Sequence, residues 1–292
     1  MQHPLRTKVV MLGSGTPNPI PDRSGPCVAV VIDETAYLVD FGSNVVRQAE
    51  KARRLGIKGL APNKLNHAFL SHLHSDHTVG IADLIFSPWV LEREKPLKLF
   101  GPKGIREMAE HTTAAFAADI KARMEMTCPT PPDGYKTEVA EAFEGVVHKD
   151  NLVTVEAFLV NHPPFVAYGY RFTTPDRIVV VSGDTAPSDN LIKYAKNCDV
   201  LVHEVISASR VRKRTPDWYE YHTTVHTTCE QLGEIAAQAQ PGMLVLYHQL
   251  FMCGENESGN EVVIRETELE VLANIRKQYS GPVFSSKDLD IF

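Results

Sequence analysis

The sequence predicts an α/β fold in which two mixed sheets pack face to face with helices outside them, a four-layer αββα sandwich. Two observations support this fold class. Strand-like runs dominate the early part of each half, and strands alternate with helical segments later. Because no linker, repeat or low-complexity segment interrupts the pattern, we expect residues 1–292 to form a single domain.

The composition is ordinary for a soluble globular protein. Of 292 residues, 43% are hydrophobic and 23% charged, and the net charge is −6. A mildly acidic chain disfavours nucleic acid as a partner, although a local basic patch would change that expectation. The five cysteines are odd in number and form no CxxC pair, which is typical of reduced thiols. With no signal-peptide stretch and no apolar run that spans a membrane, we expect a cytoplasmic protein.

The first half opens with an apolar strand that ends in a loop rich in glycine and proline, residues 13–26. Alternation and apolar runs then predict further strands, and stretches with helical periodicity lie between them. The predicted strands are 8–13, 27–32, 36–40, 66–71 and 97–100. The predicted helices are 44–55, 79–91 and 104–126.

The second half follows an irregular stretch at 129–134, where three prolines exclude both helix and ladder. Strands come first and then alternate with helices. The predicted strands are 137–142, 152–160, 167–172, 177–182, 200–203, 243–247 and 282–285. The predicted helices are 191–197, 227–238 and 261–279.

The run from His72 to His77, His-Leu-His-Ser-Asp-His, has the density of a metal-ligand motif. His72 and His74 point the same way because side chains on an extended segment alternate. Asp76 and His77 lie beyond the strand end and can turn toward a second ion. Imidazole nitrogen and carboxylate oxygen suit zinc, with manganese and iron as competitors.

Three distant residues complete a ligand set. His162, Asp184 and His248 each stand at or just after the C-terminal end of an apolar strand. Such strand ends are where α/β folds place their sites. Each residue alone could be structural, but together they supply ligands for two ions.

With these motifs the sequence resembles the metallo-β-lactamase-fold hydrolases, in the branch that holds ribonuclease Z, arylsulfatase-like and phosphodiesterase-like enzymes. The resemblance runs nearly end to end. It rests on the motifs Gly13-Ser14-Gly15-Thr16-Pro17, Ser71 to His77, His162 with Gly169-Tyr170-Arg171-Phe172, Ser182-Gly183-Asp184-Thr185, Val202-His203-Glu204, His226-Thr227-Thr228 and Tyr247-His248.

The resemblance implies a role for each matching residue. His72, His74 and His162 would bind one divalent ion, and Asp76, His77 and His248 would bind another. Asp184 would bridge the two ions, and Asp76 would also accept a proton from the nucleophilic water. Glu204 would orient and charge His226, which would protonate the leaving group. Relatives are commonly homodimers, so a dimer is expected.

The resemblance is weaker in two segments that select the substrate. Transfer-RNA-processing relatives carry a basic arm, whereas the comparable insertion at residues 102–151 is mixed to acidic and is expected to form a small helical lid. The loop after Glu204 carries Arg212, Trp218 and Tyr221, which with Phe165 could bind an anionic, aromatic substrate. A solvated charge run over packed aromatics explains the loop equally well.

We therefore expect a hydrolase that cleaves a small phosphodiester or aryl sulfate ester. Two alternatives remain open, a tRNA 3′ endonuclease of the ribonuclease Z type and a lactonase or β-lactamase that cleaves a cyclic acyl bond. A redox protein is disfavoured, because di-iron relatives usually replace a histidine ligand with an acid.

Overall fold

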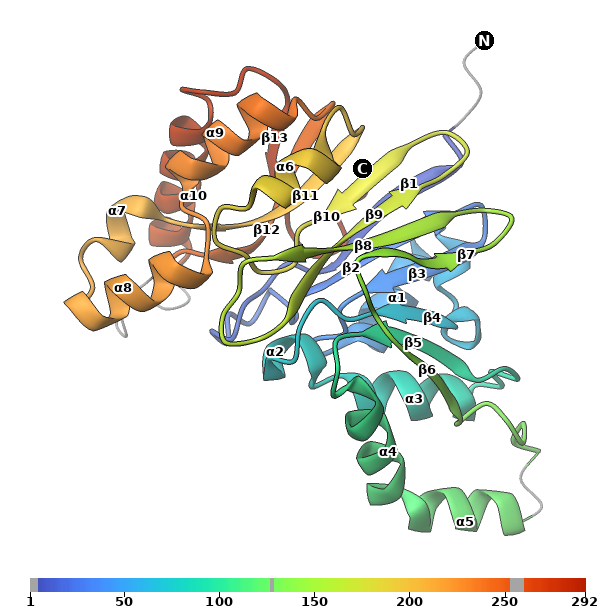
Figure 1. Cartoon of the computed structure of the whole chain (residues 1–292). Helices are drawn as coiled ribbons and strands as arrows, with labels where there is room; N and C mark the ends of the chain where they lie inside the picture. Colours follow the sequence, from blue (N-terminus) through green and yellow to red (C-terminus); the bar gives the residue numbers. More distant parts are fainter. Residues whose placement is uncertain (1–4, 127–128, 253–259) are drawn as a thin grey trace. The chain divides into compact units, whose positions relative to one another are not determined.

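The computed structural model describes residues 5–126, 129–252 and 260–292, which form two compact units. The first unit comprises Met1–Gly13, Ser24–Ala142 and Asp288–Phe292, and the second comprises Ser14–Arg23 and Phe143–Lys287. Each unit contains one mixed sheet with helices against it (Figure 1).

The sheet of the first unit has six strands in sequence order, β1 to β6. The pairs β1–β2 and β2–β3 are antiparallel, and the remaining neighbours are parallel. The strands are β1 Thr7–Gly13, β2 Cys27–Ile32, β3 Thr35–Val39, β4 His67–Phe69, β5 Leu97–Gly101 and β6 Thr137–Glu141.

The helices of the first unit pack on the apolar side chains of these strands. Val10, Ala29 and Leu38 share one buried cluster with Val45 of α1 and Leu84 of α3. The helices are α1 Val45–Arg54, η1 Lys58–Leu60, η2 Pro62–Lys64, α2 Ser75–Thr78, α3 Ile81–Val90, α4 Ile105–Ala115 and α5 Ala117–Glu125.

The last residues of the chain return to the first unit and cover the edge of β1. The Val9 N–H donates to the Phe292 carbonyl over 3.0 Å, and the Phe292 N–H returns a bond of 2.9 Å. Ile291 forms an antiparallel bridge with Val10. This pairing satisfies backbone groups that an edge strand would otherwise expose.

The insertion at residues 102–151 is helical only in its first part. The helix expected over 104–126 is divided at Phe116, whose N–H turns back to the Thr113 carbonyl over 3.2 Å and whose ring packs on Phe86 with centroids 4.5 Å apart. After the helices, β6 extends the first sheet and β7 belongs to the second. The segment expected to form a small helical lid therefore contains two helices followed by two strands.

The sheet of the second unit has seven strands in the order β13-β12-β11-β10-β9-β8-β7. The strands from β10 to β13 are parallel, and β7 to β10 pair antiparallel. The strands are β7 Gly145–Lys149, β8 Thr154–Val160, β9 Ala167–Thr173, β10 Ile178–Val181, β11 Val200–Ile206, β12 Met243–Leu250 and β13 Val283–Ser285.

Local polar groups set several boundaries in the second unit. The strand expected from residue 152 begins at Thr154, because the Asp150 carboxylate accepts the N–H groups of Leu152 and Val153 in a turn. Thr228 and Gln231 form a capping box at the start of α9. The helices are α6 Asp189–Ala195, α7 Ala208–Val211, α8 Pro216–Val225, α9 Cys229–Ala239 and α10 Glu261–Ile275.

The structure bears on two further expectations. Cys27, Cys198 and Cys229 are buried free thiols, whereas Cys128 and Cys253 lie outside the described residues. Among the described residues, no helix is long and apolar enough to cross a membrane.

Arg93 is a fully buried cation whose hydrogen bonds reach three other segments of the first unit. Its guanidinium donates five hydrogen bonds of 2.8–3.1 Å, all to backbone carbonyls. The acceptors are Leu65, Leu84, Ile85 and Gly134. Burial lowers the Arg93 pKa to about 10, so the side chain remains charged at neutral pH.

Replacing this side chain should destabilise the fold. In R93K a single ammonium cannot reach carbonyls arranged around a planar fork, so buried acceptors lose their donors. We expect the free energy of unfolding, measured by urea denaturation, to fall by about 2–4 kcal/mol. The exposed Arg276 at the end of α10 is a matched control, and an equal loss in R276K would contradict this reading of Arg93.

Candidate active site

In the first unit, the predicted metal motif follows β4 and enters the short helix α2. His72 is fully buried, and its Nε2 lies 2.8 Å from Nδ1 of the half-buried His74. Asp76 and His77 fall in α2, with 3.5 Å between Asp76 Oδ2 and His77 Nε2. The motif thus gathers imidazole and carboxylate groups in one turn of chain.

Asp40 organises this motif and is the functional residue that the sequence analysis missed. Its buried carboxylate accepts the Ser71 hydroxyl over 2.9 Å and lies 2.8 Å from Nδ1 of His77. Since the Ser71 hydroxyl donates to Asp40, it accepts from Nδ1 of His72, 2.9 Å away. Both imidazoles are therefore protonated at Nδ1 and present the lone pair of Nε2, the state a metal ligand needs.

A close backbone approach holds the short helix α2, which carries Asp76. A Cβ atom added to Gly42 would lie 2.7 Å from the Asp76 carbonyl oxygen and 2.4 Å from the Gly25 carbonyl carbon. Only glycine fits this position without moving the backbone. Gly42 follows Asp40 by two residues, so the same stretch of chain orients the imidazoles and supports α2.

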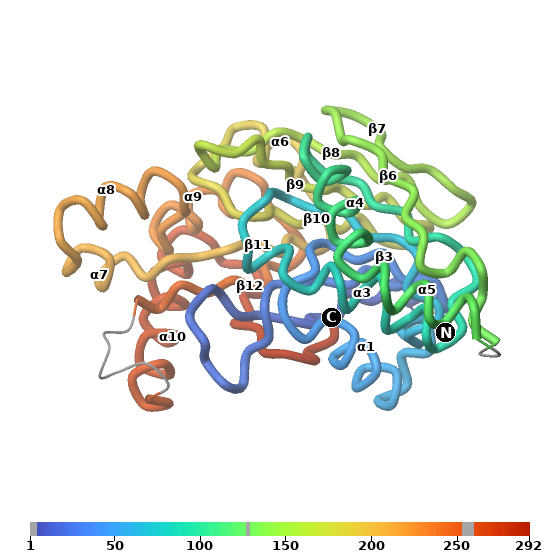
Figure 2. Tube along the Cα trace, turned by 90° about the horizontal axis from the view of Figure 1, so that it is seen from below, coloured from blue at the N-terminus to red at the C-terminus, as the bar shows by residue number. Residues whose placement is uncertain are grey.

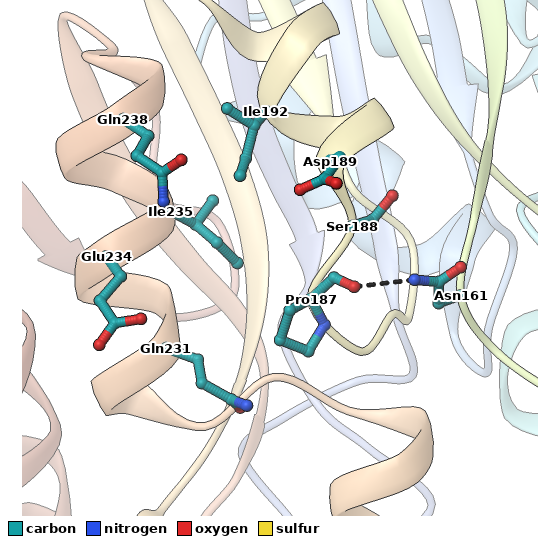
Figure 3. A pocket seen from close by; sticks show the side chains of 9 residues that line it. All are labelled: Asn161, Pro187, Ser188, Asp189, Ile192, Gln231, Glu234, Ile235 and Gln238. Carbon is teal, nitrogen blue, oxygen red and sulfur yellow. Dashed lines mark hydrogen bonds between the residues drawn. The ribbon is translucent and has the colours of Figure 1, made fainter.

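In the second unit, His162 follows β8 and is also oriented through Nδ1. This atom donates to the Val225 carbonyl over 2.8 Å, so Nε2 carries the lone pair. The neighbouring Asn161 joins this loop to the loop after Asp184. Its side-chain amide donates to the Pro187 carbonyl over 2.8 Å (Figure 3), and its backbone bridges Ala186. The amide lines a hollow of about 290 Å³ that α6 and α9 also line.

Asp184 and His248 approach each other because of two backbone irregularities. Gly183 has a φ of +63°, which turns the chain after β10. His248 has a φ of +40° and is the extra residue of a bulge where β12 shifts register against β11. The strand expected to end at residue 247 therefore continues to Leu250, and the bulge redirects the imidazole. Asp184 Oδ1 lies 3.3 Å from His248 Nδ1.

Glu204 and His226 are in direct contact in the second unit. Glu204 is fully buried in β11, and its Oε1 lies 2.9 Å from His226 Nδ1. Burial, followed by the nearby Asp184 charge, raises the Glu204 pKa well above its usual value. Backbone N–H groups of Thr185 and Thr227 oppose this shift by donating to the carboxylate. His226 Nε2 remains as the nitrogen that can exchange a proton with a substrate.

Of the suggested substrate contacts, Trp218 and Tyr221 are exposed on α8. Arg212 forms an ion pair with Glu230 instead of joining these rings, and Arg214 is the cation over Trp218, with its guanidinium carbon 5.8 Å from the ring centroid. Phe165 is half-buried in the β8–β9 loop, where its N–H donates to the His162 carbonyl over 3.1 Å.

Comparison with known proteins identifies the family. Residues 35–249 match the model of the β-lactamase superfamily domain. The protein named ribonuclease Z from Mycobacterium sp. (strain KMS) is 35% identical over 254 residues, which cover 83% of this chain and 84% of that protein.

Solved structures agree on the fold. The metallo-β-lactamase fold protein YhfI from Bacillus subtilis matches with a TM-score of 0.69 and 21% identity over 98% of both chains. Human tRNase Z, short form, matches with a TM-score of 0.66 and 18% identity, also over 98% of both chains. The predicted family and fold class, two mixed sheets with flanking helices, are confirmed.

Asp40 provides a direct test of how the imidazoles are prepared. D40N should weaken binding of a divalent ion about 10–100-fold, because asparagine is uncharged and has one accepting oxygen, whereas Asp40 accepts the Ser71 N–H at Oδ1 and the Ser71 hydroxyl and His77 Nδ1 at Oδ2. The measurement is zinc titration of chelator-treated protein, with bound metal determined by elemental analysis. Asp288, which accepts from Ser24 and Gln48 in the same unit, provides the control D288N. Equal affinities in the two variants would remove Asp40 from this role.

Proposed function

The chain belongs to the β-lactamase superfamily. We propose that it is a metal-dependent phosphodiesterase that cleaves RNA, as the name of its ribonuclease Z relatives indicates. The sequence analysis preferred a small phosphodiester or aryl sulfate ester. Relatives named ribonuclease Z favour the alternative that it kept open, and nothing supports sulfate ester cleavage.

The ligand chemistry fits divalent ions. We propose that His72, His74 and His162 bind one ion and that Asp76, His77 and His248 bind another, with Asp184 serving both. Three of these imidazoles, His72, His77 and His162, have Nδ1 tied to an oxygen, which is how proteins prepare histidine ligands. Such ions, when bound, supply a hydroxide at neutral pH and polarise the phosphoryl oxygen.

The observation that carries the proposal is the contact between Glu204 and His226. RNA cleavage expels an alkoxide, a poor leaving group that needs a proton. Glu204 fixes His226 through Nδ1, so Nε2 is the nitrogen that would pass a proton to the departing oxygen. The cyclic acyl alternative is disfavoured because relatives of the chain are named ribonuclease Z.

A basic hollow in the first unit favours a polyanionic substrate. This hollow of about 840 Å³ lies along α1 and α3, and four cations line it together with two carboxylates. The lining cations are Arg47, Lys51, Arg53 and Arg54. Glu50 pairs with Arg53 and Arg54. The hollow is therefore a local basic patch on a chain whose net charge is −6, and the overall composition does not reveal it.

The hollow and the metal motif both belong to the first unit, and the starts of α1 and α3 lie close in sequence to residues at the motif. The α3 helix begins at Ile81, just after α2, and α1 begins at Val45, three residues after Gly42. An RNA strand whose phosphates contact the hollow would therefore extend from the scissile bond along these helices. A helix of ten residues is about 15 Å long, equivalent to a few nucleotides.

A small phosphodiester remains a second candidate. The observation in its favour is the mixed charge of α4 and α5, where Asp119 pairs with Arg123 and the Glu125 carboxylate lies 3.9 Å from Lys121. These helices lack the excess of cations expected of an arm that holds a phosphate backbone.

The effect of removing His226 should depend on how much the leaving group of the substrate needs a proton. Wild-type protein with zinc should cleave a precursor tRNA, and H226A should lose about 10²–10⁴-fold in kcat on this substrate. With bis-(nitrophenyl) phosphate, whose nitrophenolate leaves without a proton, H226A should lose less than about tenfold. The comparison is made by steady-state kinetics at saturating zinc.

Equal losses on both substrates would show that His226 acts on binding or folding, and not as the acid. Wild-type activity on bis-(nitrophenyl) phosphate without RNA cleavage would select the small-phosphodiester candidate. H226N, which retains a hydrogen-bonding side chain but cannot transfer a proton at neutral pH, should resemble H226A.

Charge reversal in the basic hollow separates the two candidates. R47E/K51E should raise KM for precursor tRNA roughly tenfold in physiological salt, because phosphate contacts dominate affinity for nucleic acid. Its kinetics on bis-(nitrophenyl) phosphate should be unchanged. R276E/K277E, on the second unit, makes the same charge change away from the hollow. A similar KM increase in both variants would show that the effect comes from the net charge of the protein and not from the hollow.

A further inference from the structure

Helix α8 of the second unit presents a set of rings on one face and leads directly to His226. Trp218, Tyr221 and His222 are spaced i, i+3 and i+4, so they share that face. His226 is the C-cap residue, and its N–H donates to the His222 carbonyl over 2.9 Å. Both views show α8 beside α7 (Figures 1 and 2).

The rings form a continuous series from solvent to the proposed acid. Trp218 and His222 have centroids 5.4 Å apart and an interplanar angle of 23°. His222 and His226 follow at 5.9 Å and 28°. These values are those of offset stacking. A planar group added at the outer end would thus continue an existing stack.

The outer end of the series is open to solvent. Trp218 is 50% exposed and Tyr221 is 43% exposed, whereas His226 is 6% exposed. The Trp218 and Tyr221 rings meet edge to face, with centroids 5.8 Å apart and planes at 85°. Two large aromatics exposed at a right angle form a corner that a flat ligand can contact on its face and its edge.

The surrounding charge suits a nucleotide. The Arg214 guanidinium lies over the Trp218 ring, so a stacking base would displace it to the edge of the ring, where it can neutralise a phosphate, while Arg212 is paired with Glu230. Burial, reinforced by His226 and Arg214, lowers the His222 pKa to about 4. His222 is therefore a neutral ring at pH 7, which separates the cation from the acid. Aromatic faces with one adjacent cation are the usual means of holding an unpaired base and its phosphate.

We infer that Trp218 and Tyr221 stack the nucleobase of the nucleotide whose oxygen leaves from the scissile phosphate. The inference rests on the proposed function, since it places the leaving oxygen at His226 and the attached base one step outward along the ring series. This aromatic platform, formed by Trp218 and Tyr221, would require an unpaired nucleotide on the leaving side. It would accept any base there, because each base has a π-face.

The two tryptophans of the chain allow the platform to be tested by binding alone. Trp89 is fully buried, so Trp218 supplies the solvent-sensitive fluorescence. Adenosine 5′-monophosphate and uridine 5′-monophosphate should quench wild-type emission to saturation. Ribose 5-phosphate, which lacks a base, should not. In W218F the emission of Trp89 should be unaffected by all three compounds.

Kinetics then test the position of the base. W218A should raise KM about tenfold for an RNA with a base on the leaving side, and should not change KM for the same RNA with an abasic residue there. Y219A is the matched control, because Tyr219 is 41% exposed on the same helix but lies about 100° from Trp218 around it.

Each outcome decides the inference. Equal effects of W218A on the two RNAs, an equal effect of Y219A, or quenching by ribose 5-phosphate as strong as by the nucleotides would overturn it. If wild-type protein cleaves no phosphodiester, the proposed function fails. The fluorescence titration then still shows whether a base stacks on Trp218.

Discussion

A histidine binds a metal only through a nitrogen that carries no proton, and a free imidazole does not fix which nitrogen that is. In this protein, hydrogen bonds to Nδ1 make the choice. Asp40 fixes the Nδ1 proton of His72 through Ser71 and that of His77 directly. The Val225 carbonyl fixes the Nδ1 proton of His162. The same device serves His226, where Glu204 holds Nδ1. One kind of hydrogen bond therefore orients both the proposed metal ligands and the proposed acid.

The fold supplies this constraint at the ends of its strands. Asp40 follows β3, His162 follows β8 and Asp184 follows β10, so apolar strands determine where each polar group emerges. Regular strands alone do not complete the arrangement. A turn at Gly183 and a bulge at His248 bring an aspartate and a histidine together, each through a backbone conformation that most residues avoid.

Much of this arrangement could be predicted from the sequence, and the omissions have physical causes. Apolar runs indicated the strands, and the density of histidine at 72–77 indicated the metal motif. Asp40 was missed because a lone aspartate after a strand has no local signal, and its partners lie 31 and 37 residues away. The bulge at His248 was missed because strand periodicity does not show an inserted residue. Which arginine would approach Trp218 depended on Glu230, eighteen residues from Arg212.

The pairing of the C-terminal segment with β1 has a consequence for the order of folding. Residues 143–287 of the second unit are synthesised between most of the first unit and the segment 288–292. Until that segment emerges, the outer edge of β1 has no partner from it, although the other five strands of the sheet are already available. A nascent chain would therefore carry this strand edge without its C-terminal partner throughout the synthesis of residues 143–287, a stage at which edge-to-edge aggregation is favoured and a chaperone would be useful.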